Sequence, residues 1–275
     1  MKIHQEALAA AVALAVLCES GHAQELGTAG QFAVLAGTTV TSTGATVLNG
    51  DLGVSPGTAV TGFPPGIVNG TIYQAGPVAL QAHTDATADF NYLNGEPSMR
   101  DLTGLDLGGL TLAAGGWSCD AAAQLTGILV LDGQGDPNAQ FDLRIGSALT
   151  TASGSAVILI NGARAQNVQW AVGSSATLGV DSIFFGDIIA DQSITLNTGA
   201  NETGRLVALN GAVTLADNMV NVVPEPALGW LVGSSTLFFG LRHWLAGVAA
   251  RAATGAHSAP APPPDCNDAK WTPVR

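Results

Sequence analysis

Short segments of alternating apolar and polar residues repeat between Gly146 and Asn218, and Gly, Ser, Asn or Asp interrupts each of them. A Thr-Leu pair recurs at Thr177, Thr195 and Thr214, at spacings of 18 and 19 residues. Such a spacing is shorter than that of most helical repeats. It fits one coil of a β-solenoid, in which three strands of about five residues are joined by short turns. The pattern therefore predicts stacked coils of parallel strands.

The alternation of side chains along a strand predicts which residues of each coil face outward. If Leu178, Leu196 and Leu215 point into the core, the threonine before each of them points out of the same wall. Successive coils stack at about 4.7–4.9 Å, so these threonines would form a ladder. Thr150 occupies the matching place 27 residues before Thr177. We expect a flat wall without long or charged side chains.

One segment has the period of an amphipathic helix instead. Apolar residues follow the i, i+3, i+4 spacing between Pro77 and Leu93, while Asp85 and Asp89 lie off this stripe. Asn94 and Gly95 are expected to end the helix. A single amphipathic helix beside a solenoid has to lie along one wall, which leaves the other walls for function.

Short strands separated by dense turn signals are expected before the helix, at 32–35 and 38–41. The Pro-rich segment 62–66 cannot continue a ladder, because proline has no N–H. The uninterrupted apolar run 157–160 predicts a strand that is covered on both faces.

The composition agrees with a mainly β chain: of 275 residues, 35 are glycine, only 5% are aromatic and 11% are charged. The net charge is −12, and only four basic residues stand against sixteen acidic ones between Gln24 and Val222. This charge balance argues against a nucleic-acid partner.

The chain shows few of the residue groupings that catalysis needs. His83 is the single histidine of the central region, and no nucleophile motif accompanies it. Cys119 has no partner there for a disulfide or a metal site. We interpret the segment 132–136 and the residues Asp181, Asp187 and Asp191 as turns. The chain is therefore expected to be neither an enzyme nor a binder of a metal or cofactor.

The two ends have different compositions from the centre. Residues 1–23 resemble a secretory signal peptide, because a weakly basic start is followed by an apolar run and small residues. Residues 223–251 resemble the bacterial PEP-CTERM sorting signal, with Pro-Glu-Pro, an apolar segment and then basic residues. A plain C-terminal membrane anchor is the alternative interpretation. Residues 252–275 form a Pro/Ala-rich tail. The protein is therefore expected outside the cell or at its surface.

Residues 24–222 resemble the microbial ice-binding-like family of antifreeze proteins. The resemblance is carried by GDLGVSPGTAVTGFPPG at 50–66, YLNG at 92–95, DLGGLTLAAGGWS at 106–118, FDLRIGSALTTASGS at 141–155, INGARAQNVQWAVGSSATLG at 160–179 and SITLNTGANETGRLVALNGAVTLADN at 193–218. It implies a discontinuous β-solenoid of triangular cross-section with one long helix packed along a wall. It also implies a monomer whose flat face, away from the helix, adsorbs to an ice crystal.

Some members of that family carry a Thr-Ala/Gly-x-Thr/Asn motif on this face, and the segments 43–46, 58–61 and 198–201 fit it. Together with the ladder, this motif defines the candidate ice-binding residues: Thr41, Thr43, Thr46, Thr150, Thr177, Thr195, Thr198, Asn201 and Thr214.

Two other functions fit the same fold. The first is a surface adhesin or structural matrix module without affinity for ice, which the sorting-like C-terminus favours. The second is a polysaccharide-cleaving enzyme, which would need a charged cleft that the scattered basic residues do not suggest.

Overall fold

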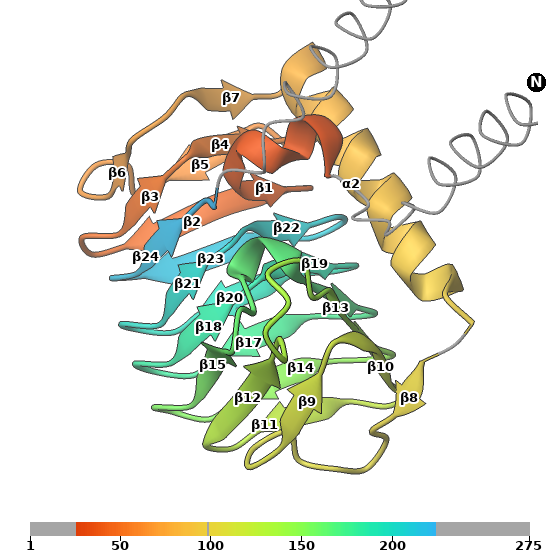
Figure 1. Ribbon diagram of the computed structural model, residues 1–275. Helices are drawn as coiled ribbons and strands as arrows, with labels where there is room; N and C mark the ends of the chain where they lie inside the picture. Colours follow the sequence, from red (N-terminus) through yellow and green to blue (C-terminus); the bar gives the residue numbers. More distant parts are fainter. Residues whose placement is uncertain (1–25, 98, 224–275) are drawn as a thin grey trace, which may run out of the picture. The chain divides into compact units, whose positions relative to one another are not determined.

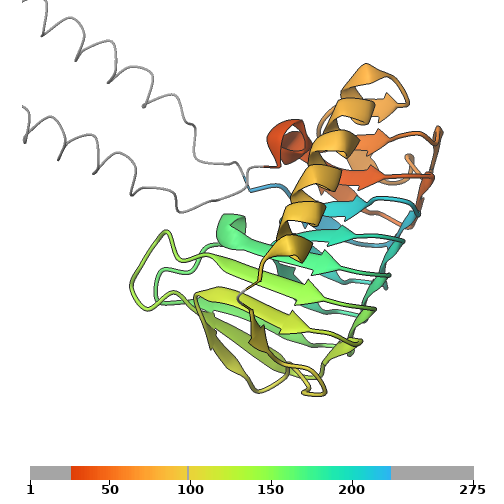
Figure 2. The ribbon, with the colours of Figure 1, turned by 90° about the vertical axis from the view of Figure 1, so that its right-hand side faces the viewer.

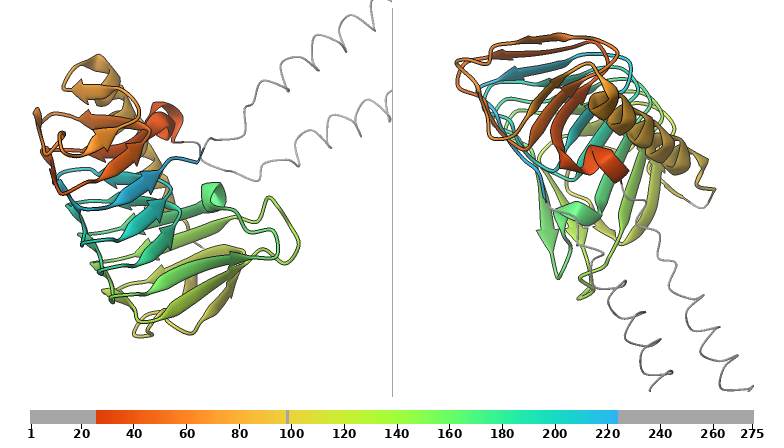
Figure 3. Two further views of the ribbon diagram at one scale, coloured as in Figure 1. Left: turned by 90° about the vertical axis from the view of Figure 1, so that its left-hand side faces the viewer. Right: turned by 90° about the horizontal axis from the view of Figure 1, so that it is seen from above.

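The structure is a computed structural model that describes residues 26–97 and 99–223; the expected signal peptide and C-terminal segments lie outside the described residues. Three sheets of parallel strands form the walls of a solenoid of triangular cross-section, as seen from above in Figure 3. The mainly β solenoid that the repeats predict is therefore confirmed.

The strands of each sheet follow one another along the stack. Sheet A has the order β7 (Ile72–Gln74), β4 (Asp51–Val54), β1 (Phe32–Ala36), β22 (Leu206–Ala208), β19 (Asp187–Ala190), β16 (Val168–Val172), β13 (Phe141–Ile145), β10 (Gly115–Cys119) and β8 (Arg100–Asp101). Sheet B has the order β11 (Ala123–Leu125), β14 (Leu149–Thr151), β17 (Ala176–Leu178), β20 (Ile194–Leu196), β23 (Val213–Ala216), β2 (Thr39–Thr43) and β5 (Ala59–Thr61). Sheet C has the order β6 (Ile67–Val68), β3 (Val47–Asn49), β24 (Met219–Asn221), β21 (Asn201–Thr203), β18 (Ile183–Phe185), β15 (Ala156–Ile160), β12 (Ile128–Asp132) and β9 (Thr111–Ala113).

The stack is discontinuous in sequence. The chain forms its first coil with β1, β2 and β3, adds a second coil with β4 to β7, and then runs along the stack through α2 (Pro77–Gly95). From the far end, β8 onward, it builds coils back toward the start (Figure 1). The last coil, β22 to β24, pairs with the first coil in all three sheets. We call this contact between the last and the first coil the joint.

The helix α2 covers sheet A, as predicted, and Figure 2 shows it crossing the strands of that wall. Its buried residues include Ala82, Ala86 and Leu93, which pack with outward residues of sheet A and with η1 (Gly27–Gln31) in a second apolar core. The position of Asp89 differs from the prediction, because this side chain is fully buried rather than off the packed stripe. The helix packs so closely on sheet A that it buries a wider face than its stripe of apolar residues alone.

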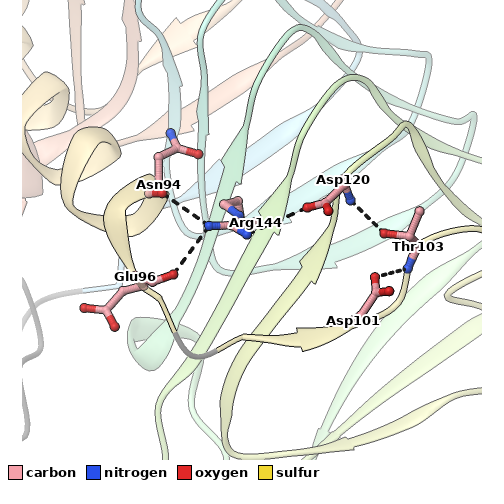
Figure 4. A network of polar contacts seen from close by, with 6 residues as sticks. All are labelled: Asn94, Glu96, Asp101, Thr103, Asp120 and Arg144. Atoms are coloured by element: carbon pink, nitrogen blue, oxygen red, sulfur yellow. Dashed lines mark hydrogen bonds and ion pairs between the residues drawn. The ribbon is translucent and has the colours of Figure 1, made fainter.

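The end of α2 is fixed by a side chain from the wall beneath it. Arg144 on β13 donates from Nη1 to the carbonyl oxygens of Asn94 and Glu96, at 3.2 and 3.4 Å (Figure 4). These carbonyls lie at a helix end, where they lack partners within the helix, so a guanidinium there both caps and anchors it. The ion pair between Arg144 and Asp120, at 3.8 Å, continues this contact toward Thr103.

Sheet C corrects one expectation. The run 157–160 lies in β15, where Val157 is buried but Ile158 and Ile160 are 39% and 37% exposed. The outer face of sheet C has no helix against it within the described residues. A run covered on both faces occurs instead in sheet A, where all five residues of β1 are buried.

A buried ion pair ties both ends of the described chain to the stack. The guanidinium of Arg205 bonds Asp187 at 2.8 Å, the carbonyl oxygen of Gly30 at 2.7 Å and that of Val223 at 3.0 Å. Its side chain is 1% exposed. The interpretation of Asp187 as a turn residue is therefore wrong, since it begins β19 and serves as the counter-ion of this arginine. Asp181 does lie in a turn, with a φ of 54°.

Glu202 lies in the same region with its side chain 1% exposed. Burial, and secondarily the negative charge of Asp187, raises the pKa of Glu202 well above its usual value. In the pH range between the two values, the folded state binds this proton and the unfolded state does not. Stability then falls as the pH rises.

We therefore expect Glu202→Gln to become increasingly more stable than the wild type as the pH is raised above about 4.5, the usual pKa of a glutamate, because glutamine carries no proton to lose. Urea unfolding of both proteins across this range measures the difference. If the free energies of unfolding of the two proteins differed by the same amount at every pH, the result would contradict the buried, protonated state of Glu202.

Candidate functional site

The outer face of sheet B carries a continuous row of threonines. The strand registers pair Gln124 with Thr150 and then align six threonines, one from each successive coil: Thr150, Thr177, Thr195, Thr214, Thr41 and Thr61. We call these six residues the threonine ladder. All of them are exposed or half-buried. Parallel pairing places neighbouring members about 4.7–4.9 Å apart.

Alternation along each strand explains why the ladder threonines face outward. In β17, β20 and β23 the residues on either side of the ladder threonine are buried, including Leu178, Leu196 and Leu215. These leucines belong to the main apolar core of the solenoid. A shift of one residue would expose the core side chains, so burial of the leucines fixes the outward direction of the threonines.

The residues flanking the ladder are small. Two positions before the ladder threonines lie Ala148, Ser175, Ser193, Ala212, Thr39 and Ala59. Two positions after them lie Ala152, Gly179, Asn197, Ala216 and Thr43, and then the larger, half-buried Phe63. None of these positions is charged, although most protein surfaces carry many charged side chains. The result is a flat face of methyl and hydroxyl groups, which we call the threonine face.

The other two walls differ from this face. Sheet A is covered by α2. The outer face of sheet C has longer side chains: Ile128, Ile158, Ile160, Ile183 and Met219 are between 37% and 50% exposed. Of the three walls, sheet B is the one that combines an open face with a regular row of one residue type.

The structure brings together five of the nine candidate residues. Thr41, Thr150, Thr177, Thr195 and Thr214 are all members of the ladder. Thr43 lies one row away on β2, paired with Ala216.

The remaining three candidates lie elsewhere. Thr198 is exposed in the turn after β20, and Asn201 begins β21 on sheet C. Thr46 is fully buried; its hydroxyl accepts from Ser42 at 2.8 Å and from the backbone N–H of Asn218 at 3.3 Å. The expectation that Thr46 faces outward is therefore wrong, because the chain turns the corner between sheets B and C there.

Two members of the row are not among the nine candidates. Thr61 ends the motif segment 58–61 and lies 20 residues after Thr41, close to the repeat of 18 to 19 residues, so both the motif and the spacing point to it. Gln124 continues the row at the far end of the stack. Leu125 follows it, so this coil keeps the leucine of the Thr-Leu pair and has glutamine in place of the threonine.

Among the described residues, few groups that could take part in catalysis lie near this face. No group of three His, Cys, Asp or Glu side chains within 26–97 and 99–223 is placed to hold a metal ion. His83 packs on the wall under α2, where burial lowers its pKa. Asp142, whose pKa burial and Glu96 raise to about 6, lies on sheet A near the end of the helix.

These features define a class: parallel β-solenoids with one helix along a wall and an open, regular face. Residues 34–221 match the model of the family described as ice-binding-like, and the chain belongs to that family. An ice-binding protein of Nostoc sp. (strain HG1) is 53% identical over 213 residues, which cover 73% of this chain and 79% of that protein.

Two solved structures agree with the fold. An ice-binding protein from an Antarctic biological consortium has 45% identity and a TM-score of 0.70, covering 71% of this chain and 89% of that one. An ice-binding protein from the Antarctic ascomycete Antarctomyces psychrotrophicus has 40% identity and a TM-score of 0.71, covering 73% and 98%.

The different positions of Thr46 and Thr214 lead to different expected effects of alanine. Thr46→Ala should lower the free energy of unfolding by about 1–3 kcal/mol, because it removes a buried hydroxyl from two hydrogen bonds. Thr214→Ala should change it by at most about 0.5 kcal/mol, since it removes only exposed atoms. Urea unfolding of the two variants measures both effects. Equal losses would contradict the placement of these residues.

Proposed function

We propose that the protein binds ice through the threonine face and thereby inhibits the growth and recrystallisation of ice. The observation that carries the proposal is the unbroken alignment of six threonines on an open wall whose ladder and flanking rows carry no charged side chain. The related proteins described above, which are named for ice binding, support it.

Adsorption to a crystal requires many weak contacts that form at the same time. Threonine offers a methyl and a hydroxyl group on a β-branched side chain with few rotamers, so little side-chain entropy is lost on docking. The backbone hydrogen bonds between coils hold these groups at a constant spacing. A lysine or glutamate on this face would keep its own hydration shell and hold the crystal away.

We further propose that the protein acts outside the cytoplasm, either released or held at the cell surface. The support is the composition of residues 1–23 and of 223–251, which resemble an export signal and a sorting or anchoring segment. Within the described residues, no helix has the length and apolarity to cross a membrane. Detection of the protein in the medium or on intact cells tests this proposal, and recovery only from lysed cells would contradict it.

We expect Thr195→Lys to weaken inhibition of ice recrystallisation by roughly tenfold or more, equivalent to at least about 1.4 kcal/mol of adsorption free energy. The substitution places a long, hydrated side chain in the middle of the ladder. The measurement is the lowest protein concentration that stops recrystallisation, with thermal hysteresis read on the same sample.

Thr203→Lys is the matched control, because Thr203 belongs to the same coil but to sheet C. It should leave the inhibition unchanged. Equal activity of the wild type and Thr195→Lys would exclude the threonine face as the ice-binding surface. A folded wild type without any effect on ice would overturn the function itself, and glycan binding would then test the adhesin alternative.

A further inference from the structure

The threonine ladder crosses the joint between the last and the first coil. Thr150, Thr177, Thr195 and Thr214 belong to coils that follow one another along the chain, whereas Thr41 and Thr61 come from the first two coils. Thr214 and Thr41 are neighbours in the ladder but 173 positions apart in sequence. Between these two coils, unlike between the others of the ladder, no short stretch of chain limits how one coil slides or tilts relative to the other.

A side chain beside the ladder bridges this step. Asp217 follows β23 directly, and its Oδ1 accepts a hydrogen bond of 2.6 Å from the backbone N–H of Ala45 in the first coil. Its own N–H donates to the carbonyl oxygen of Thr43 at 3.0 Å. The carboxylate thus holds the chain at the end of β2, two residues from the ladder row.

The backbone on both sides of the joint is adapted to this contact. Gly44 has a φ of +77°, and a Cβ added there would lie 2.0 Å from Oδ1 of Asp217. Any other residue at position 44 would displace the carboxylate. Asp217 itself has a φ of 51°, a conformation that aspartate tolerates better than most residues.

The same arrangement occurs once more in the continuous part of the stack, which supplies a comparison. Asp181 has a φ of 54°, donates its N–H to the carbonyl oxygen of Thr198 at 3.0 Å, and lies over Gly199, where a Cβ would be 2.2 Å from its Oδ1. There, however, the N–H of Ala200 donates to the carbonyl oxygen of Asn197 instead. The two coils are also joined by a short stretch of chain, from β18 to β20.

We infer that Asp217 is a positioning residue for the threonine face: by bonding Ala45 across the joint, it keeps Thr214 and Thr41 in one row. The inference rests on the proposed function, because it concerns how the face for ice is assembled. Backbone pairing of β2 with β23 aligns Thr41 with Thr214, and the bond from Asp217 adds the restraint that a short connection supplies elsewhere in the stack. Without it, we expect the four threonines of the continuous coils and the two of the first coils to move relative to each other more easily.

The test compares three variants of the full chain near 0 °C. Asp217→Gly removes the carboxylate without backbone strain, because glycine adopts positive φ freely. Asp217→Asn keeps an oxygen that can accept from Ala45. Asp181→Gly makes the same deletion in the continuous stack. Hydrogen exchange of the backbone amides of β2, β23 and Ala45 reports on the joint, and recrystallisation inhibition reports on the face.

We expect Asp217→Gly to speed exchange at the joint by about tenfold, as the loss of one hydrogen bond to a charged acceptor predicts. We also expect it to raise the protein concentration needed for inhibition. Asp217→Asn should restore both quantities in large part, and Asp181→Gly should change neither. Circular dichroism verifies that each variant is folded at the temperature of the assay.

Each other result has a distinct meaning. If Asp217→Gly and Asp181→Gly behave alike, or if exchange at the joint rises while inhibition stays constant, Asp217 does not position the face. If the wild type does not affect ice, the proposed function fails before the variants are compared, whereas the exchange data still report on the joint.

Discussion

The hydrogen-bonded register between successive coils is the constraint on which the rest of the structure depends. In a parallel stack, each residue of a strand pairs with its equivalent in the next coil, so one residue type repeated at the coil period becomes one straight row. Burial of the leucine or valine beside each ladder threonine then decides which row faces inward. The register and the apolar core therefore support each other, and together they keep the threonine face flat.

The three walls share this backbone geometry but differ in what covers them. Where α2 and η1 pack against sheet A, its outer face carries apolar residues such as Leu35, Ile189 and Val207, and Arg144 holds the far end of the helix. Sheets B and C have no such cover in the described part of the chain. Sheet B carries short side chains with hydroxyl and methyl groups, and sheet C carries larger aliphatic ones such as Ile158 and Ile183. The two open walls therefore differ in their side chains rather than in their backbone, and the proposed role of sheet B rests on that difference.

Much of this arrangement could be predicted from sequence because it follows local periods. The spacing of Thr177, Thr195 and Thr214 and the adjacent leucines define both the coil and its outward row. The helix has its own period and its own stop signals at Asn94 and Gly95. The corners were harder to predict, because a turn between walls can direct a threonine inward. Thr46 and Asn201 both end a Thr-Ala/Gly-x-Thr/Asn motif, yet Thr46 is buried under the corner and Asn201 is exposed at the start of β21.

The joint has no local signal in the sequence, because it depends on a pairing between the beginning and the end of the domain. A solenoid that grew in one direction would present both terminal coils as open ends. Here the last coil pairs with the first, so the strands most exposed to edge pairing lie at β5 to β7 and at β8, β9 and β11 instead.

Because the last coil pairs with the first, the threonine row, which extends across many coils, depends on a contact between segments far apart in sequence. Arg205, which bonds Asp187, Gly30 and Val223, secures that contact from inside the corner between sheets C and A, whereas Asp217 acts beside the ladder itself. The buried ion pair therefore keeps the two ends of the domain together, and the surface carboxylate reinforces the backbone pairing of β2 with β23 that aligns the ladder.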